Sequence, residues 1–382
     1  MPKVFVPRET QAGETRVAAT PETVKAFVKA GLEVVVEADA GRASHLLDPT
    51  YSEAGARITT APALEWGQAD LVLKVVGPTP EQAASLKPGA ILVSFIAPHK
   101  NLALVKALAA QKISTLAMEL VPRITRAQKM DALSSQASIA GYKAVLVGAS
   151  RLGKYFPLLM TAAGTVQPAK VVIMGAGVAG LQAIATAKRL GAVIWVSDVR
   201  PAVKEQVESL GGKFIDLPME ESGEGQGGYA KEMSAEFLAK QQAIIAEHVA
   251  SADVVITTAQ IPGKPAPRLV TAATVEKMRP GSVIVDLAAE QGGNCELTEP
   301  GAEVVKHEVL IVGTTNWPAT MPLDASMLYA RNIQALVLHI LKKAEGGPTL
   351  TIDVAEEVTR GTLLTHAGEV VHGPTAKALE TA

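Results

Sequence analysis

A glycine-rich string in the middle of the chain has the spacing that can hold the pyrophosphate of a dinucleotide. Residues 175–180 read Gly-Ala-Gly-Val-Ala-Gly, a Gly-x-Gly-x-x-Gly pattern. The spacing alone is weak evidence, because the chain contains 32 glycines. Its surroundings strengthen it, since residues 171–174 read as an apolar strand and residues 181–190 as a helix. The sequence therefore predicts a strand–loop–helix unit that binds phosphate.

Each glycine of this string has its own physical reason. Gly175 permits a tight turn after the strand, Gly177 lets the backbone approach a pyrophosphate, and Gly180 lets helix and strand pack closely. Val178 stands where the helix begins, and free N–H groups with a partial positive charge face an anion there. These four residues are predicted to contact a dinucleotide.

The choice of dinucleotide depends on residues 198–200, Asp-Val-Arg, which follow the next apolar run at residues 193–197. A carboxylate at Asp198 suits an adenosine ribose and repels a 2′-phosphate, which favours NAD(H) over NADP(H). Arg200 argues the other way, because a nearby arginine can bind a 2′-phosphate. Asp198 could also be an ordinary loop residue or a helix cap. We predict NAD(H), with Asp198, Val199 and Arg200 at the adenosine end.

The turnover of a small substrate would need further groups. A dehydrogenase acting on an amino or hydroxy acid needs a cation for the carboxylate and a proton-transfer group beside the nicotinamide. Arg16 and Lys74 are candidate cations, and His99, Asp286 and Glu290 are candidate bases. No His/Cys cluster is spaced for a metal, and no Gly-x-Ser-x-Gly elbow or Walker loop occurs. Hydrolase, nucleotidase and metal-dependent functions are therefore disfavoured.

Composition limits the class of protein. The 382 residues are 48% hydrophobic and 19% charged with a formal net charge of −2, so neither general disorder nor nucleic-acid binding is indicated. The one cysteine, Cys295, excludes a disulfide framework and fits a reducing compartment. The first residues lack the apolar core of a signal peptide, and no apolar run could span a bilayer. We therefore expect a soluble protein.

The elements that would position these groups alternate between apolar runs and helical patterns, which indicates βα units and mainly parallel sheets. One series of strands is predicted at residues 4–6, 32–36, 70–76, 90–95 and 113–117. A second is predicted at residues 170–174, 193–197, 213–217, 253–257, 282–287 and 310–313. The fold class is therefore α/β with two doubly wound, Rossmann-like domains, of which the second binds the dinucleotide.

Two helices are expected to connect these domains. One covers residues 133 to about 148, and the other covers residues 331–343 and crosses back to the first domain. The expected domains are therefore residues 1–137 with 318–382, and residues 138–317. Residues 350–371 read as short strands with turns at 360–361 and 367–368, and the glycine-rich residues 220–229 read equally as a surface linker or as a lid over the nucleotide.

Longer strings resemble a known family. The chain resembles the alanine dehydrogenase/transhydrogenase superfamily over nearly its whole length. The resemblance is carried by residues 14–21 around Arg16, residues 73–75 and the glycine loop. Within it, residues 122–142, 227–233 and 261–267 are similar to the NAD(H)-binding domain of proton-translocating nicotinamide nucleotide transhydrogenases. The resemblance implies direct hydride transfer between two nicotinamides, of the Si/Re-specific type.

The resemblance also implies roles for individual residues. Arg123, Gln128, Asp131 and Ser134 would surround the nicotinamide and its ribose and phosphates, with Arg123, Gln128 and Asp131 acting in catalysis by positioning. Gln128 would lie between the two dinucleotides. The remaining implied contacts are Gly228 and Tyr229 on the glycine-rich segment, Gln241 and Gln260.

A comparison with alanine dehydrogenases separates the two branches of the superfamily. Those enzymes place a catalytic histidine two residues after the aromatic at the end of the strand that here ends at Phe95, and this chain has Ala97 there. His99 is two positions further on, and Glu290 stands where the sister family has an aspartate. Without the histidine, oxidative deamination lacks its proton shuttle, whereas transhydrogenation needs none. An alanine dehydrogenase-like enzyme and a non-catalytic NAD sensor remain alternatives.

The transhydrogenase resemblance further implies an assembly. This chain would be the soluble NAD(H)-binding subunit, because it has no membrane-spanning segment. NADP(H) would be held by a partner subunit, and the membrane helices would belong to another chain. A homodimer on the cytoplasmic face of a bacterial inner membrane is expected.

Overall fold

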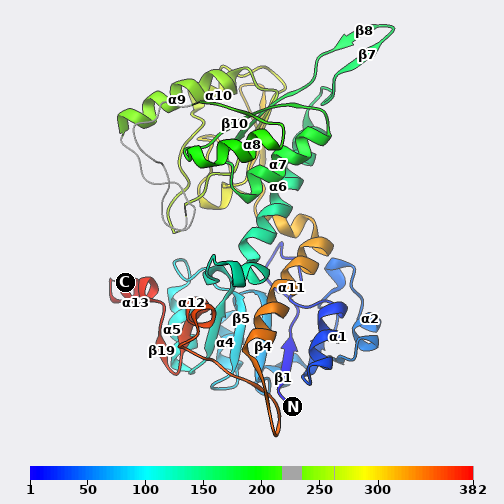
Figure 1. The fold of residues 1–382 in the computed structure, drawn as a ribbon, viewed down its shortest axis with the longest axis vertical. Coiled ribbons are helices and arrows are strands. Elements are labelled where there is room, and N and C mark those ends of the chain that lie inside the picture. The colour runs from blue at the N-terminus through cyan, green and yellow to red at the C-terminus, as the bar shows by residue number, and fades with distance from the viewer. Residues whose placement is uncertain (217–234, 262, 382) are drawn as a thin grey trace. The chain divides into compact units, whose positions relative to one another are not determined.

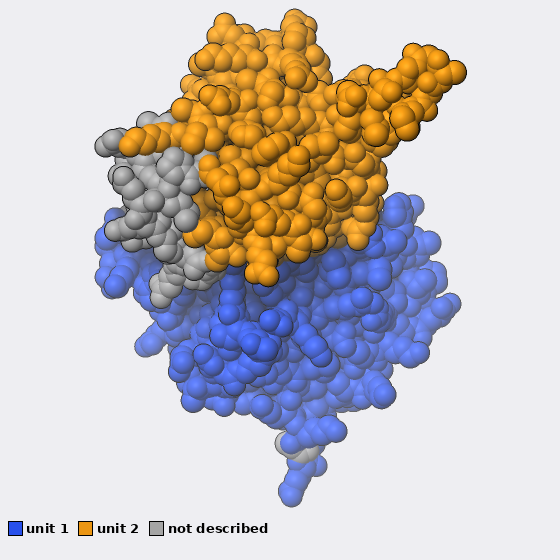
Figure 2. All heavy atoms as spheres, turned by 45° about the horizontal axis from the view of Figure 1, so that its top comes forward, with its two compact units in different colours: residues 1–136, 319–382 blue, residues 137–318 orange. Residues whose placement is uncertain are grey.

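The computed structural model describes residues 1–216, 235–261 and 263–381, which form two compact units. Unit 1 contains Met1–Gln136 and Ala319–Ala382, and unit 2 contains Ala137–Pro318 (Figure 2). Unit 1 is therefore discontinuous in sequence. Each unit is built on one large, mainly parallel sheet, which confirms the predicted α/β fold with two Rossmann-like domains (Figure 1).

The sheet of unit 1 has the strand order β19-β18-β6-β5-β4-β1-β2-β3. Its first six strands in chain order are parallel and follow the 3-2-1-4-5-6 order of a doubly wound fold. β18 and β19 extend it as antiparallel strands. The strand bounds are β1 Lys3–Val6, β2 Glu33–Glu37, β3 Arg57–Thr59, β4 Leu71–Val76, β5 Ile91–Phe95, β6 Ser114–Ala117, β18 Leu363–His366 and β19 Glu369–Val370.

Helices cover both faces of this sheet, so its central strands are buried on both sides and read as continuous apolar runs. Val34 and Val36 pack into one core and Val35 into the other, as the alternation of a strand requires. Helix bounds in unit 1 are α1 Pro21–Lys29, α2 Asp48–Glu53, α3 Pro62–Trp66, α4 Pro80–Ser85, α5 Leu102–Ala110, α11 Pro322–Ile340, α12 Glu357–Thr362 and α13 Gly373–Thr381. A short β-hairpin pairs β16 (Leu341–Ala344) with β17 (Gly347–Leu350).

The N-terminus of α1 shows how the sequence sets an element boundary. Thr20 accepts a hydrogen bond from the Thr23 N–H, and the Thr23 side chain accepts one from the Thr20 N–H. Pro21 occupies the first helical turn, where its missing N–H costs nothing. These contacts set the start of α1 directly after Thr20.

The sheet of unit 2 has the order β11-β10-β9-β12-β13-β15-β14, again 3-2-1-4-5-6 for the parallel strands, with β14 antiparallel at the edge. α6 (Ala132–Arg151) carries the chain from unit 1 into unit 2. The remaining bounds are β7 Leu159–Thr161, β8 Gly164–Val166, β9 Lys170–Met174, α7 Val178–Arg189, β10 Val193–Ser197, α8 Lys204–Ser209, β11 Lys213–Phe214, α9 Ala235–Ala250, β12 Val254–Thr257, α10 Ala272–Val275, β13 Val283–Asp286, β14 Glu303–Lys306 and β15 Val309–Val312.

Two predicted elements near the C-terminus were wrong in part. The helix expected at residues 331–343 begins already at Pro322 and ends at Ile340. Residues 360–361, expected as a turn, lie inside α12, whose N-terminus is capped by the Glu356 side chain through the Thr359 N–H at 2.7 Å. The turn at residues 367–368 is confirmed, because Ala367 and Gly368 both have positive φ between β18 and β19.

Among the residues that the structure describes, no helix combines the length and the apolar character needed to cross a membrane.

Candidate functional site

The loop after β9 shows why glycine is required at its first position. β9 ends at Met174, and the backbone turns at Gly175 with a φ of +104°. The Thr258 hydroxyl, just after β12, donates to the Gly175 carbonyl at 3.1 Å, and a Cβ on Gly175 would lie 2.4 Å from the hydroxyl oxygen. β9 and β12 are the neighbours at which the strand order reverses, so this loop lies at the topological switch point of unit 2.

Gly177 and Gly180 lack a side chain for different reasons. A Cβ on Gly180 would lie 1.8 Å from the Gly175 carbonyl oxygen, so the loop and the first turn of α7 touch there. A Cβ on Gly177 would meet nothing within 4 Å. Gly177 is the N-cap of α7 and offers no capping side chain, so the first N–H groups of the helix, beginning at Val178, are available to an anion. Gly180 therefore serves the fold, whereas Gly177 leaves space for a ligand.

A further glycine supports the loop and was not singled out from the sequence. Gly141 lies within α6, and a Cβ there would approach the Ala179 carbonyl oxygen to 2.0 Å. α6 therefore packs directly against the backbone of the first turn of α7. A glycine in the middle of a helical pattern is the sequence signal that points to such a close approach.

Asp198, directly after β10, accepts hydrogen bonds from the glycine loop and from Arg200. Its carboxylate accepts the Ala176 N–H at 2.7 Å and the Arg200 N–H at 2.9 Å. The Arg200 guanidinium donates to both carboxylate oxygens, at 2.9 and 2.8 Å. The Asp198 side chain is 5% exposed and that of Arg200 15%. The structure thus brings Asp198 and Arg200 to the glycine loop, with the half-buried Val199 between them.

The other residues expected at the dinucleotide fall in different places. Gln260 is exposed after β12, and its side-chain amide donates to the Leu287 carbonyl at 2.9 Å. Gln241 belongs to α9, but its side chain lies outside the described residues. Gly228 and Tyr229, with the whole segment expected as a linker or a lid, also lie outside them.

In unit 1, the residues expected at the nicotinamide lie on one short stretch. The 3₁₀ helix η3 (Thr125–Met130) presents Gln128 to solvent, and Arg123 just before it is also exposed. Asp131 caps α6, because its carboxylate accepts the Ser134 N–H at 2.9 Å and the Ser134 hydroxyl at 2.6 Å. Asp131 and Ser134 are thus brought into direct contact.

The two candidate cations are both paired inside unit 1. Arg16 binds both oxygens of Glu14, at 2.8 and 2.7 Å, and also donates to Gln136 Oε1 at 2.9 Å. Lys74 Nζ lies 2.8 Å from Glu9, and these two side chains are 1% and 4% exposed. Arg16 and Lys74, the candidate cations, therefore each have a carboxylate partner within the same unit.

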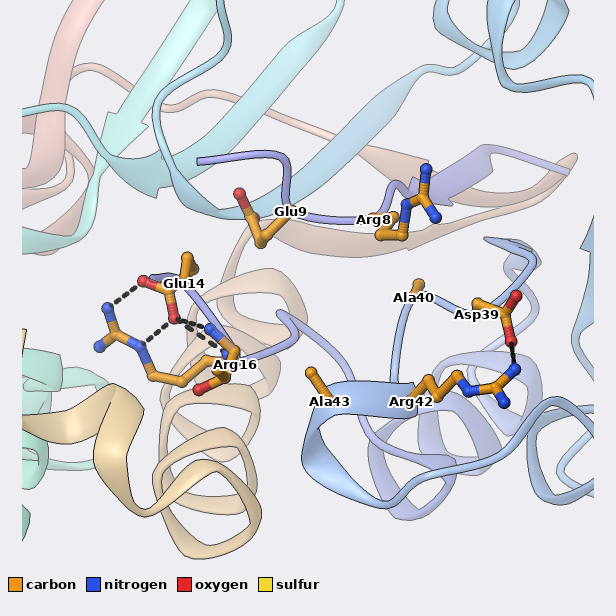
Figure 3. A pocket seen from close by; sticks show the side chains of 9 residues that line it. Arg8, Glu9, Glu14, Arg16, Asp39, Ala40, Arg42 and Ala43 are labelled. Carbon is orange, nitrogen blue, oxygen red and sulfur yellow. Dashed lines mark hydrogen bonds and ion pairs between the residues drawn. The ribbon is translucent and has the colours of Figure 1, made fainter. Parts of the chain in front are cut away.

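A cavity of about 320 Å³ lies beside these pairs, lined by residues that include Glu9, Glu14, Arg16 and Arg42. Figure 3 shows Arg16 and Glu14 pointing toward one another, while Arg42 points away from them toward Asp39. The guanidinium groups of Arg16 and Arg42 therefore do not converge on one point of this cavity.

Just beyond the carboxyl end of β5 lies Ala97, the residue that the sequence comparison set at the place of the sister family's catalytic histidine. Ala97 lies two residues beyond the end of β5 and has a φ of +49°. Oε1 of the half-buried Glu119 accepts the N–H groups of Ile96 and Ala97, which fixes this loop. Burial raises the pKa of Glu119. His99 is exposed, and the remaining burial lowers the pKa of its ring.

The last two candidate bases also have structural partners. Asp286 is fully buried and accepts hydrogen bonds from Thr257, Thr298 and the N–H groups of Ala288 and Cys295. A carboxylate so fully occupied holds the end of β13 in place, and this structural role replaces the expected role as a base. Glu290 is exposed, and its carboxylate accepts the N–H of Asn316.

Comparisons with known proteins agree with this geometry. The model of the alanine dehydrogenase/PNT N-terminal domain matches residues 5–140, and that of the C-terminal domain matches residues 144–373. A Rhodospirillum rubrum protein named as the first part of NAD(P) transhydrogenase subunit alpha is 50% identical over 378 residues, covering 97% of this chain and 98% of that protein. Alanine dehydrogenase 2 of Staphylococcus aureus is 31% identical, covering 99% and 96%.

A solved structure titled as the transhydrogenase of Sinorhizobium meliloti has a TM-score of 0.86 and 46% identity, covering 96% of this chain and 99% of that one. The family of this chain follows from three observations together: the glycine loop at the switch point, the Asp131–Ser134 cap and the full-length matches. It belongs to the alanine dehydrogenase/PNT family, and within that family it is more similar to these transhydrogenase alpha subunits than to the alanine dehydrogenase compared with it.

Proposed function

We propose that this chain is the NAD(H)-binding subunit of a proton-translocating transhydrogenase and transfers a hydride between its own NADH and NADP⁺ on a partner subunit. One observation carries the proposal: position 97, at the carboxyl end of β5, is alanine, so a proton-transfer histidine is missing there. A hydride can pass between two nicotinamides without such a group. Oxidative deamination must also transfer a proton, and without such a group this transfer is slower.

The proposed mechanism is one of binding and alignment. The space at Gly177 and the free N–H groups of α7 fit the pyrophosphate of NAD(H), and Asp198 fits its adenosine ribose. NAD(H) would supply the hydride chemistry itself. Arg123, Asp131 and Ser134 would hold the nicotinamide end, and the exposed Gln128 would face the second nucleotide. Hydride transfer depends steeply on the distance and alignment of the two rings, so positioning is the main contribution of the chain.

Gln128→Asn tests this role. Shortening the side chain by one methylene should slow hydride transfer by about 10- to 100-fold, because misplacement of about 1 Å can cost that much. NADH affinity should change little, because the proposed partner of Gln128 is the other dinucleotide. Stopped-flow measurement of hydride exchange with an NADP(H)-binding partner gives the rate, and fluorescence titration gives the affinity. Gln11→Asn, at an exposed glutamine of the same unit, is the control; equal rates in both variants would contradict the role of Gln128.

The main competing function is alanine oxidation. The wild-type protein incubated with NAD⁺ and L-alanine should form no NADH above background, whereas the same preparation should exchange hydride once the NADP(H)-binding partner is added. Robust NADH formation from alanine would overturn the proposed function. Tight NADH binding without either activity would favour a nucleotide sensor.

Asp198→Ala tests the choice of nucleotide. Without the carboxylate, the ribose loses its acceptor, and the Arg200 guanidinium, now 2.8 Å from Asp198, can turn to a 2′-phosphate. We expect NADH to bind about 10-fold more weakly and NADPH about 10-fold more tightly, each about 1.4 kcal/mol. Asp216→Ala, which removes an exposed carboxylate paired with Lys204 in the same unit, is the control for net charge. Parallel losses for both nucleotides would contradict this role of Asp198.

The assembly belongs to the same proposal. The membrane-spanning region and the NADP(H) site would lie on partner chains, and this chain would act as a homodimer at the cytoplasmic face of a bacterial inner membrane. The full-length similarity to a protein named as one piece of an alpha subunit supports a multisubunit enzyme.

A further inference from the structure

We propose that Asn332, on α11, is a positioning residue for the hydride-transfer site, because it joins the backbone next to Gln128 to the first turn of α6. The inference rests on the proposed function. Asn332 lies about 200 positions along the chain from the residues that it bonds, so no local motif identifies it. All of the residues concerned belong to unit 1.

The side-chain amide of Asn332 uses both of its ends. Nδ2 donates to the Lys129 carbonyl at 2.9 Å, and Oδ1 accepts the Ser135 hydroxyl at 2.7 Å. Asn332 is 8% exposed, so water competes little for these bonds. An amide carries a donor and an acceptor on one planar group, which a carboxylate or an alkyl side chain of the same size does not.

The first bond acts on the element that carries Gln128. η3 is six residues long, whereas runs of 3₁₀ helix beyond about four residues are uncommon because their hydrogen-bond geometry is poor. Such a helix needs support from its surroundings. Ala127 and Met130 supply it on the buried side by packing into the core of unit 1. Asn332 supplies it at the end, by occupying the carbonyl of the residue that follows Gln128.

The second bond acts on the element that carries Ser134. Ser135 lies in the first turn of α6, directly after Ser134 and one turn beyond the capping residue Asp131. A single side chain therefore ties the end of η3 to the start of α6. The distance from Gln128 to the Asp131–Ser134 pair is fixed by that connection.

A second contact of α11 supports the start of α6 without supporting η3. Gln136 Nε2 donates to the Ala325 carbonyl of α11 at 3.1 Å, and Gln136 Oε1 accepts from Arg16. The first of these bonds holds the start of α6 against α11, and the second ties it to Arg16. They do not include η3, so the start of α6 should stay in place when Asn332 is changed, while η3 gains freedom.

Two substitutions of Asn332 test the proposal. Asn332→Ala removes both bonds, and Asn332→Asp keeps the acceptor for Ser135 but loses the donor for the Lys129 carbonyl. With the NADP(H)-binding partner and saturating nucleotides, both variants should transfer hydride about 10- to 100-fold more slowly than wild type. The Kd for NADH should change by less than about threefold, because binding at the glycine loop of unit 2 is untouched.

Ser326→Ala is the matched control. Ser326 is a fully buried polar residue on the same helix, and its hydroxyl bonds Ser44 at 2.8 Å and the Val17 N–H at 3.1 Å. Its loss should lower the Tm about as much as Asn332→Ala but leave hydride transfer unchanged. A merely structural role for Asn332 would slow both variants in proportion to their loss of stability, and that result would overturn the proposal.

A second readout does not depend on the proposed function. Hydrogen–deuterium exchange of the isolated protein should be faster over residues 125–131 in Asn332→Ala than in wild type and in Ser326→Ala. Unchanged exchange there would overturn the positioning role, even if the rate of hydride transfer fell. Faster exchange in a protein whose wild type transfers no hydride would instead support the connection through Asn332 and count against the proposed function.

Discussion

Gly180→Ala is expected to destabilise unit 2 itself, whereas Gly177→Ala is expected to leave the fold intact and abolish NADH binding. The added methyl at position 180 would lie 1.8 Å from the backbone oxygen of Gly175, which cannot move without opening the loop. At position 177 the methyl meets no protein atom within 4 Å, and the backbone is not in the left-handed region. It would occupy the space that a pyrophosphate needs.

Thermal unfolding and NADH titration distinguish the pair. Gly180→Ala should lose several degrees of Tm and bind NADH weakly as a consequence. Gly177→Ala should keep a Tm close to that of wild type without nucleotide, but lose the rise in Tm that NADH gives the wild type. Gly153→Ala, at a glycine of unit 2 whose Cβ would also meet nothing within 4 Å, is the control. NADH binding by Gly177→Ala at wild-type affinity would contradict the assignment of this loop.

Lys74→Met is expected to cost about 3–5 kcal/mol of the free energy of unfolding, because it leaves the buried Glu9 without its cation. Glu9 also accepts the Val75 N–H at 2.6 Å, so its carboxylate cannot turn to solvent without breaking the end of β4. Burial raises the pKa of Glu9 above its ordinary value of 4.5, and Lys74 opposes that shift. Because the folded-state pKa of Glu9 is raised, its protonated form contributes stability at low pH, and that stability is lost as pH rises through this pKa. The loss of unfolding free energy caused by Lys74→Met should therefore be greater at alkaline than at mildly acidic pH.

Two further variants make this prediction specific. The exposed pair Lys87–Asp70 has side chains 46% and 37% exposed, so Lys87→Met should cost less than about 1 kcal/mol. Adding Glu9→Gln to Lys74→Met should recover much of the loss, because the unpaired charge is gone. Urea unfolding of the wild type and the three variants at two pH values measures each cost. A cost for Lys74→Met no greater than that for Lys87→Met would show that the buried pair is not a stabilising contact.

The central strands and the glycine loop could be predicted because their signals are local. A strand buried on both faces is a short apolar run, and residues 171–174 and 254–257 are such runs. The start of α11 was missed for the opposite reason. Its first turns present Ala325 and Ser326 to the interior, small residues that carry no apolar periodicity, although both are fully buried.

The partners of charged residues were beyond the reach of the sequence. Residue type suggested Asp286 as a base, but three of its four hydrogen bonds come from Thr257, Cys295 and Thr298, which the fold brings to it. Arg16 was a candidate cation for a substrate carboxylate, but in the structure its guanidinium binds the carboxylate of Glu14, two residues away. Pairing of buried charges depends on side-chain direction and burial, and neither follows from spacing alone.

The return of the chain to unit 1 has a consequence for synthesis on the ribosome. Residues 137–318 emerge before residues 319–382, so unit 2 can complete its sheet while unit 1 still lacks α11 and β18. Until then β6 is an unpaired edge, and the face of the sheet that α11 later covers with Ile333, Leu336 and Val337 stays open to water. The N-terminal third of the chain therefore completes its sheet and its core only after residues 319–382 have been synthesised.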